Sequence, residues 1–179
     1  MLIAGAGLLL KNETKANRIP ENLEGQMKFF ISHKQEDEEI VKKLALYFKL
    51  REVDFYLDLL DSKLTEDGKA LTDHIKSNLN NCTDIIVVMS EKTRFSQWVP
   101  FEVGIATQME LPIASFLKSE VQLPGFLSYW PRLKTPGDID KYLDARELVA
   151  EKMKILYENR QFASRKNTEI EMFYKQVKS

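Results

Sequence analysis

The sequence is short of the residues that build disulfides, metal sites and strongly charged surfaces. Cys82 is the one cysteine among 179 residues, so no internal disulfide can form, and this favours a reducing, cytoplasmic compartment. Two histidines and one cysteine offer no zinc-binding constellation, and we expect no metal. Twenty-six basic residues balance 27 acidic ones. A net charge of −1 favours neither nucleic acid nor a membrane surface as a partner.

Long hydrophobic runs are also missing. Residues 1–10, MLIAGAGLLL, are too few to cross a bilayer and lack the basic segment and cleavage site of a signal peptide. Their Gly-Ala-Gly lacks the third glycine and the preceding strand of a dinucleotide-binding fingerprint. We interpret residues 1–10 as a docked terminal element or an oligomer contact, with a membrane-associating tip as the alternative. We interpret the polar residues that follow, up to residue 26, as a connector.

What the sequence does contain is an alternation of apolar strands and amphipathic helices. Strand patterns occur at residues 27–32, 53–58, 84–90, 111–117 and 129–134. Helical patterns occur at residues 36–51, 69–82, 96–110 and 139–159, with a further short helix within 160–179. The run at 84–90 is typical of a strand covered on both faces, and Pro131 indicates an edge strand. This alternation predicts a parallel α/β sheet with helices on both faces.

Ligands of such sheets bind beyond the carboxyl ends of the strands. Polar residues lie at the carboxyl ends of three of the predicted strands: Ser32, His33 and Lys34 at the first, Asp58 at the second and Ser90 at the third. The next helix presents Trp98 and Glu102, which share one face because they are four residues apart. A carboxylate in so apolar a segment is costly to bury unless something pairs with it or uses it. An aromatic ring beside an acid can hold an electron-poor ring and a hydroxylated sugar.

Structural roles are open for the same residues. Glu102 could be a capped or salt-bridged acid on a helix face, and Trp98 could belong to the core. His33 could be a hydrogen-bonding loop residue, and Lys34 a solvated lysine. Three further features have simple structural interpretations: His74 as a satisfied surface residue, Cys82 as packing, and the acidic run 36–39 as a helix N-terminus that favours negative charge.

In their order and spacing these segments resemble a TIR (Toll/interleukin-1 receptor) domain of the bacterial type, over about residues 27–145. The motifs are a first strand ending in ISH, a second strand YLD, a long loop to Gly68, a helix with I-x-x-x-L-x-x-C, the strand IIVVMS and W-x-x-x-E. The resemblance implies a flavodoxin-like doubly wound parallel sheet. We therefore divide the chain into an N-terminal element and connector (1–26), a TIR domain (27–145) and a C-terminal helical extension (146–179).

The resemblance also implies an activity, because catalytic TIR domains cleave NAD at the nicotinamide–ribose bond. It places the catalytic glutamate at Glu102 and the companion aromatic at Trp98. It places the nucleotide pocket at Ser32, His33 and Lys34. The segment from Asp58 to Gly68 corresponds to the mobile loop that gates the site or mediates assembly. NAD is then a substrate and no cofactor is implied. The sequence HKQ departs from the pair of basic residues that many members have here.

Three hypotheses follow. The first is an NAD-consuming enzyme that releases nicotinamide and ADP-ribose, a cyclic ADP-ribose isomer or a related nucleotide. A small TIR protein of this kind resembles the signal-producing component of a Thoeris-type antiphage system, in which the product acts on a separate effector protein. The second is a non-enzymatic module that associates with other TIR domains. The third is a relative of nucleoside deoxyribosyltransferases, in which the glutamate acts as a nucleophile. Self-association is expected, since a neighbouring protomer often completes TIR sites.

Overall fold

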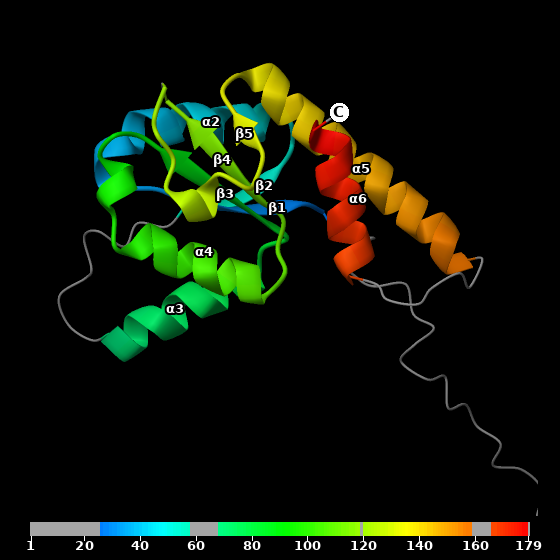
Figure 1. Ribbon diagram of the computed structural model, residues 1–179, viewed down its shortest axis with the longest axis horizontal. Coiled ribbons are helices and arrows are strands. Elements are labelled where there is room, and N and C mark those ends of the chain that lie inside the picture. The colour runs from blue at the N-terminus through cyan, green and yellow to red at the C-terminus, as the bar shows by residue number, and fades with distance from the viewer. Residues whose placement is uncertain (1–25, 58–67, 119, 159–165, 179) are drawn as a thin grey trace, which may run out of the picture.

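A twisted sheet of five parallel strands forms the centre of the molecule (Figure 1). The computed structural model describes residues 26–57, 68–118, 120–158 and 166–178. The strands are β1 (Lys28–Ser32), β2 (Asp54–Leu57), β3 (Asp84–Met89), β4 (Ile113–Leu117) and β5 (Arg132–Leu133). Their order in the sheet is β2-β1-β3-β4-β5, and every neighbouring pair is parallel. This is the doubly wound, flavodoxin-like order, and the predicted fold class is confirmed.

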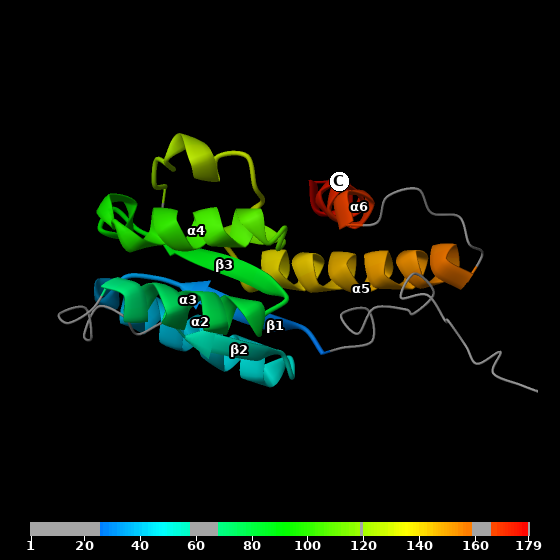
Figure 2. The same ribbon diagram turned by 90° about the horizontal axis from the view of Figure 1, so that it is seen from below.

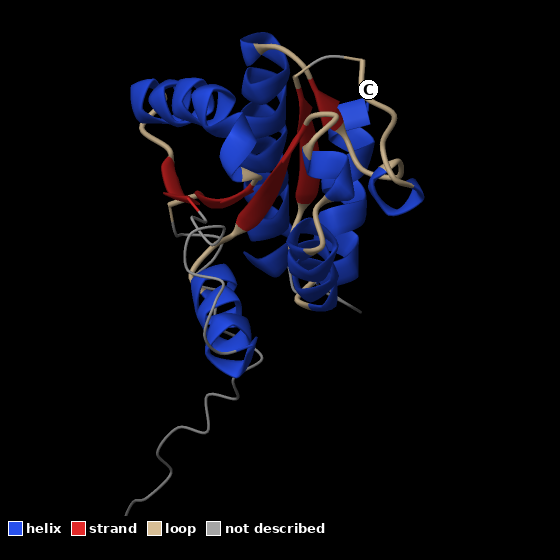
Figure 3. Ribbon diagram, turned by 90° about the vertical axis from the view of Figure 1, so that its left-hand side faces the viewer, coloured by secondary structure: helices blue, strands red, loops and turns tan. Residues whose placement is uncertain are grey.

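Helices cover both faces of this sheet (Figure 3). They are α2 (Glu38–Leu50), α3 (Gly68–Asn80), α4 (Trp98–Gln108), α5 (Pro136–Glu158) and α6 (Lys166–Lys178). Apolar side chains of α3 and α4 pack on one face, and those of α2, α5 and α6 pack in a second cluster on the other. Figure 2 shows α6 beside α5. No helix among the described residues combines the length and apolar character needed to cross a membrane.

The central strand β3 explains how the apolar pattern encodes this layering. Successive side chains of a strand point to opposite faces, so Ile85 and Val87 enter the cluster of α3 and α4, whereas Ile86 and Val88 enter the cluster of α2 and α5. All six residues of β3 are buried, as the continuous apolar run predicts. The fifth strand lies at the sheet edge, as Pro131 indicates, but spans only two residues.

Other boundaries differ from the sequence patterns by a few residues. The helix predicted from residue 96 begins at Trp98, because the Ser96 hydroxyl accepts hydrogen bonds from the N–H groups of Trp98 and Val99 at 3.2 and 3.4 Å. The loop predicted at 59–68 lies outside the described residues except for Gly68, which begins α3. The proposed division at residue 145 falls within α5, and the division into domains stays a prediction.

A buried charge network joins α5 and α6 to the amino end of β3. Arg146 of α5 lies 3.0 Å through Nε from Asp84 Oδ1 and 3.2 Å through Nη1 from Glu169 of α6. The Tyr142 hydroxyl donates to Asp84 at 2.7 Å. Asp84 has no exposed surface, and Arg146 and Glu169 are also buried. Helix α6 is thus tied to the sheet by ion pairs as well as by the apolar packing of Phe173.

The first turn of α5 carries a capping arrangement with a pH-dependent contribution. Asp138 accepts hydrogen bonds from the N–H groups of Lys134 and Thr135, both at 2.9 Å, and these bonds hold its pKa below the usual 3.8. A lowered pKa means that this stabilisation is present above pH 3.8 and is lost as pH falls through the folded-state pKa. We expect Asp138→Ala to cost about 1 kcal/mol at neutral pH. Urea unfolding measures the difference in unfolding free energy between wild type and Asp138→Ala, and this difference should shrink in strong acid. An equal difference at neutral pH and in strong acid would contradict this account.

Candidate functional site

The centre of the candidate site is a contact between Ser32 and Glu102. Ser32 is the last residue of β1, and Glu102 lies on the second turn of α4. The Ser32 hydroxyl donates a hydrogen bond to Glu102 Oε2. Ser32 is fully buried and Glu102 is 3% exposed, so the carboxylate lies in an environment of low dielectric. The contact sits at the carboxyl end of β1, next to β3, where the strand order reverses and flavodoxin-like sheets bind ligands.

A second contact joins the segment after β1 to the segment after β3, and sequence patterns alone did not reveal it. Asp37 accepts hydrogen bonds through Oδ2 from the Ser90 hydroxyl at 2.6 Å and from the Thr93 hydroxyl. We call these three residues the Asp37 clamp. All three are buried. The acidic run 36–39 was interpreted as helix N-terminal charge, and the signal that could have separated Asp37 from it is the polar Ser-x-x-Thr directly after β3.

Trp98 combines a core contact with a partly open ring. It begins α4, is half-buried, and packs against the apolar cluster of α3 and α4. Its ring meets that of Phe101 edge to face, with centroids 6.0 Å apart. Trp98 therefore packs in part against the core, and its role in binding stays a prediction.

The other predicted binding residues follow Ser32. The His33 ring is half-buried and its Nδ1 lies 3.3 Å from the Ile31 carbonyl, which accepts a hydrogen bond from it. Lys34 Nζ lies 3.1 Å from Glu36 in a partly exposed ion pair, a type of pair worth little in stability. Asp58 lies outside the described residues. The structure therefore brings Ser32 and Glu102 together and places His33 and Lys34 next along the chain.

Two further side chains that the sequence singled out are Cys82 and His74. Cys82 is buried, and burial raises the pKa of its thiol to about 11, so the thiol is protonated and a poor nucleophile at neutral pH. His74 is exposed on α3, with its Nε2 2.9 Å from the Tyr56 hydroxyl. Across the described ranges, no group of three or more His, Cys, Asp or Glu side chains is placed to hold a metal ion.

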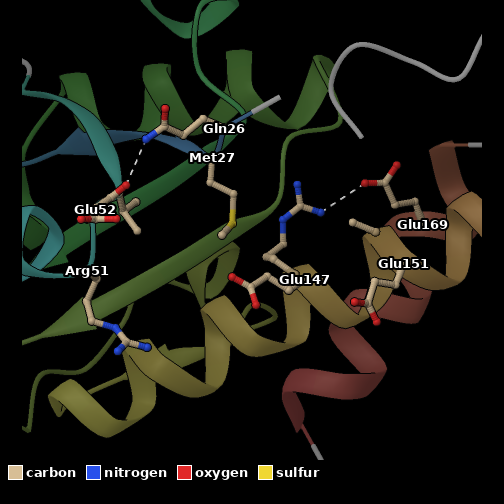
Figure 4. A pocket seen from close by; sticks show the side chains of 10 residues that line it. Gln26, Met27, Arg51, Glu52, Glu147, Glu151 and Glu169 are labelled. Carbon is tan, nitrogen blue, oxygen red and sulfur yellow. Dashed lines mark hydrogen bonds and ion pairs between the residues drawn. The ribbon is translucent and has the colours of Figure 1, made fainter. Parts of the chain in front are cut away.

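A pocket of about 440 Å³ lies at the end of the sheet opposite to the contact between Ser32 and Glu102 (Figure 4). It is lined by Met27 before β1, by Val53 before β2, and by residues of α5 and α6. Figure 4 shows the acidic side chains of Glu147, Glu151 and Glu169 on its α5 and α6 side. Because Met27 precedes β1 and Ser32 is its last residue, this pocket is separate from the site at Glu102.

Comparison with known proteins places this fold in a family. None of the curated proteins compared matches the sequence. Two of the solved structures that match this chain are the following. The TIR domain of the Toll-related receptor TRR-2 from Hydra magnipapillata is 19% identical, over 58% of this chain and 82% of that one, with a TM-score of 0.47. The TIR domains of the activated Roq1 resistosome that recognises the pathogen effector XopQ are 16% identical, over 86% and 84%, with a TM-score of 0.41.

The family assignment comes from a model of the TIR domain that matches residues 29–152, more than half of the chain. The matched segment contains both Ser32 and Glu102, together with the three residues of the Asp37 clamp. The chain belongs to the TIR domain family.

Proposed function

We propose that this TIR protein is an enzyme that consumes NAD by cleaving the bond between nicotinamide and ribose. The observation that supports the proposal is the nearly sealed carboxylate of Glu102, bonded to Ser32 at the ligand-binding end of the sheet. An acid with a structural role alone gains little from this place, since burying a carboxylate costs free energy.

The chemistry needs one well-placed carboxylate. The electron pair of the glycosidic bond leaves with nicotinamide, which departs as a neutral base, and positive charge develops on the ribose. The Glu102 carboxylate can stabilise this oxocarbenium-like charge, and burial strengthens the interaction. Water then attacks the ribose to give ADP-ribose and a proton, whereas attack by a hydroxyl or base nitrogen of the same nucleotide gives a cyclic isomer. Because Glu102 is 3% exposed, the ribose can reach it only after neighbouring atoms move.

The direct test measures nicotinamide released from NAD by the purified protein, together with the mass of the second product. Release with ADP-ribose or a cyclic isomer supports the proposal. A covalent sugar adduct trapped on Glu102 would instead favour the deoxyribosyltransferase chemistry. Absence of release at high protein concentration, and in extract of phage-infected cells, would count against an enzyme.

We expect Ser32→Ala to lower the rate of nicotinamide release by about tenfold to a hundredfold, because a hydrogen bond to a charged group is worth about 1.5–3 kcal/mol. Without the hydroxyl, the Glu102 carboxylate loses a donor that fixes its orientation. Ser32→Thr keeps the hydroxyl and should retain more activity, and Ser77→Ala on the exposed face of α3 is the matched control. Initial rates at saturating NAD decide the matter, and equal rates for Ser32→Ala and wild type would contradict this role.

The wider biological role is a proposal from the sequence resemblance alone. The nucleotide product would act as a signal on a separate effector protein in a Thoeris-type antiphage response, and the enzyme would self-associate in the cytoplasm. The alternative, a scaffold without catalysis, is favoured by one observation. A shallow groove of about 570 Å³ runs between α3 and α4, lined by apolar residues such as Phe101, Ile105 and Met109. Self-association without nicotinamide release would support the scaffold.

A further inference from the structure

We propose that Asp37 is a positioning residue, which holds the turn after β3 against the turn after β1 and so sets the place of Glu102 relative to Ser32. The effect on catalysis rests on the proposed function, whereas the effect on the position of α4 does not.

The side chain of Asp37 does not cap helix α2, although its place in the chain would allow it to. It directly precedes α2, where an aspartate ordinarily accepts a hydrogen bond from an N–H group of the first helical turn. Its side chain makes no such capping bond and instead accepts from Ser90 and Thr93. The side chain is 2% exposed, so its carboxylate has exchanged water for these hydroxyl donors. Burial of this kind is costly unless the donors are fixed in place.

Ser90 links Asp37 to the backbone of the turn after β3. While its hydroxyl donates to Asp37, the same oxygen accepts hydrogen bonds from the N–H groups of Lys92 and Thr93, at 3.1 and 3.2 Å. The Thr93 hydroxyl donates to the same carboxylate oxygen of Asp37 as Ser90 does. One carboxylate therefore orients two hydroxyls, and through Ser90 two backbone amides of residues 90–93.

The oriented turn leads into the helix that carries Glu102. The 3-10 helix Thr93–Phe95 follows at once, and Ser96 then accepts hydrogen bonds from the first two residues of α4. In the segment after β1, Asp37 lies five residues beyond Ser32. The segments after β1 and β3 are thus joined twice, by the Asp37 clamp and by the bond between Ser32 and Glu102. The Asp37 clamp therefore opposes a rotation of α4 that would separate Glu102 from Ser32.

The experiment compares Asp37→Ala with wild type by amide hydrogen exchange and by nicotinamide release. Exchange is followed at four amides: Lys92, Thr93, Trp98 and Val99. We expect faster exchange at all four, and a fall in kcat of about tenfold to a hundredfold, because small misplacement of a reacting group has effects of this size. KM should change much less than kcat. Asp73→Ala, an exposed acid on α3, is the matched control and should change neither measurement.

Each further outcome has a fixed meaning. Faster exchange at Lys92 and Thr93 with wild-type exchange at Trp98 and Val99 would overturn the proposal, because the clamp would then end before α4. A wild-type protein that releases no nicotinamide would overturn the proposed function, while exchange at Trp98 and Val99 would still decide the positioning. If Asp37→Ala does not fold, Thr93→Val removes one donor with little change of shape and takes its place. Asp37→Asn keeps an oxygen acceptor and should restore part of the rate.

Discussion

Glu102→Gln lowers the rate of nicotinamide release at least about a hundredfold, the expected size when one group that stabilises transition-state charge is removed. Glutamine keeps the shape of the side chain and an oxygen that can accept from Ser32. It carries no charge, so it cannot stabilise positive charge on the ribose. The melting temperature should stay the same or rise, because the variant no longer buries a carboxylate. Loss of activity with unchanged stability identifies a group kept for chemistry.

Release of nicotinamide and thermal unfolding are measured on the same preparation. Glu171→Gln, an exposed glutamate on α6, is the matched control and should behave as wild type in both. Glu102→Ala tests the same point with a larger change of volume. A Glu102→Gln protein that turns over NAD at the wild-type rate would remove Glu102 from the mechanism. A large loss of stability together with activity would favour a structural acid.

Arg146→Ala destabilises the protein by about 3–5 kcal/mol, the usual cost of removing one partner from a buried ion pair. Burial opposes the charge on Arg146, but Asp84, Tyr142 and Glu169 favour it more strongly, and the pKa of the guanidinium rises. Without the guanidinium, the fully buried carboxylate of Asp84 has lost its cation. The ion pair to Glu169 is lost as well, and with it the charged link between α5 and α6.

Urea unfolding measures this loss, and Arg51→Ala provides the comparison. Arg51 also pairs with an aspartate, Asp140 at 3.1 Å, but both side chains are more than a third exposed. The expected cost there is below about 1 kcal/mol. Equal costs at the two arginines would mean that the buried network contributes no more than a surface pair. Adding Asp84→Asn to Arg146→Ala should recover part of the stability, since it removes the uncompensated charge.

Local patterns were enough to predict the layers of this protein. The run 84–90 and the helical spacing of Val41, Leu44 and Phe48 report which side chains are buried, and burial follows from local periodicity. Pro131 placed the last strand at an edge because proline cannot donate to a ladder. The flavodoxin-like order came from the family resemblance, since periodicity carries no information on which strands become neighbours.

The site could be predicted only as separate ends of strands. Ser32 and Glu102 were both singled out, but their hydrogen bond joins residues 70 apart and depends on how α4 packs on the sheet at β3 and β4. Asp37 was missed because an acid before a helix is the ordinary signal of a helix start. The network of Asp84 and Arg146 was missed for a related reason, since its members lie 62 residues apart and none forms a motif.

The buried thiol of Cys82 can be used to measure local opening at the junction of α3 and β3. With its pKa near 11 and its sulfur covered at the junction of α3 and β3, the native thiol should react slowly with alkylating reagents. Labelling then measures how often this junction opens, and the labelling rate follows the free energy of that opening. Because no second cysteine competes for the reagent, one mass shift per chain records the event. A ligand that binds the native state would be seen as slower labelling, without any need to observe its turnover.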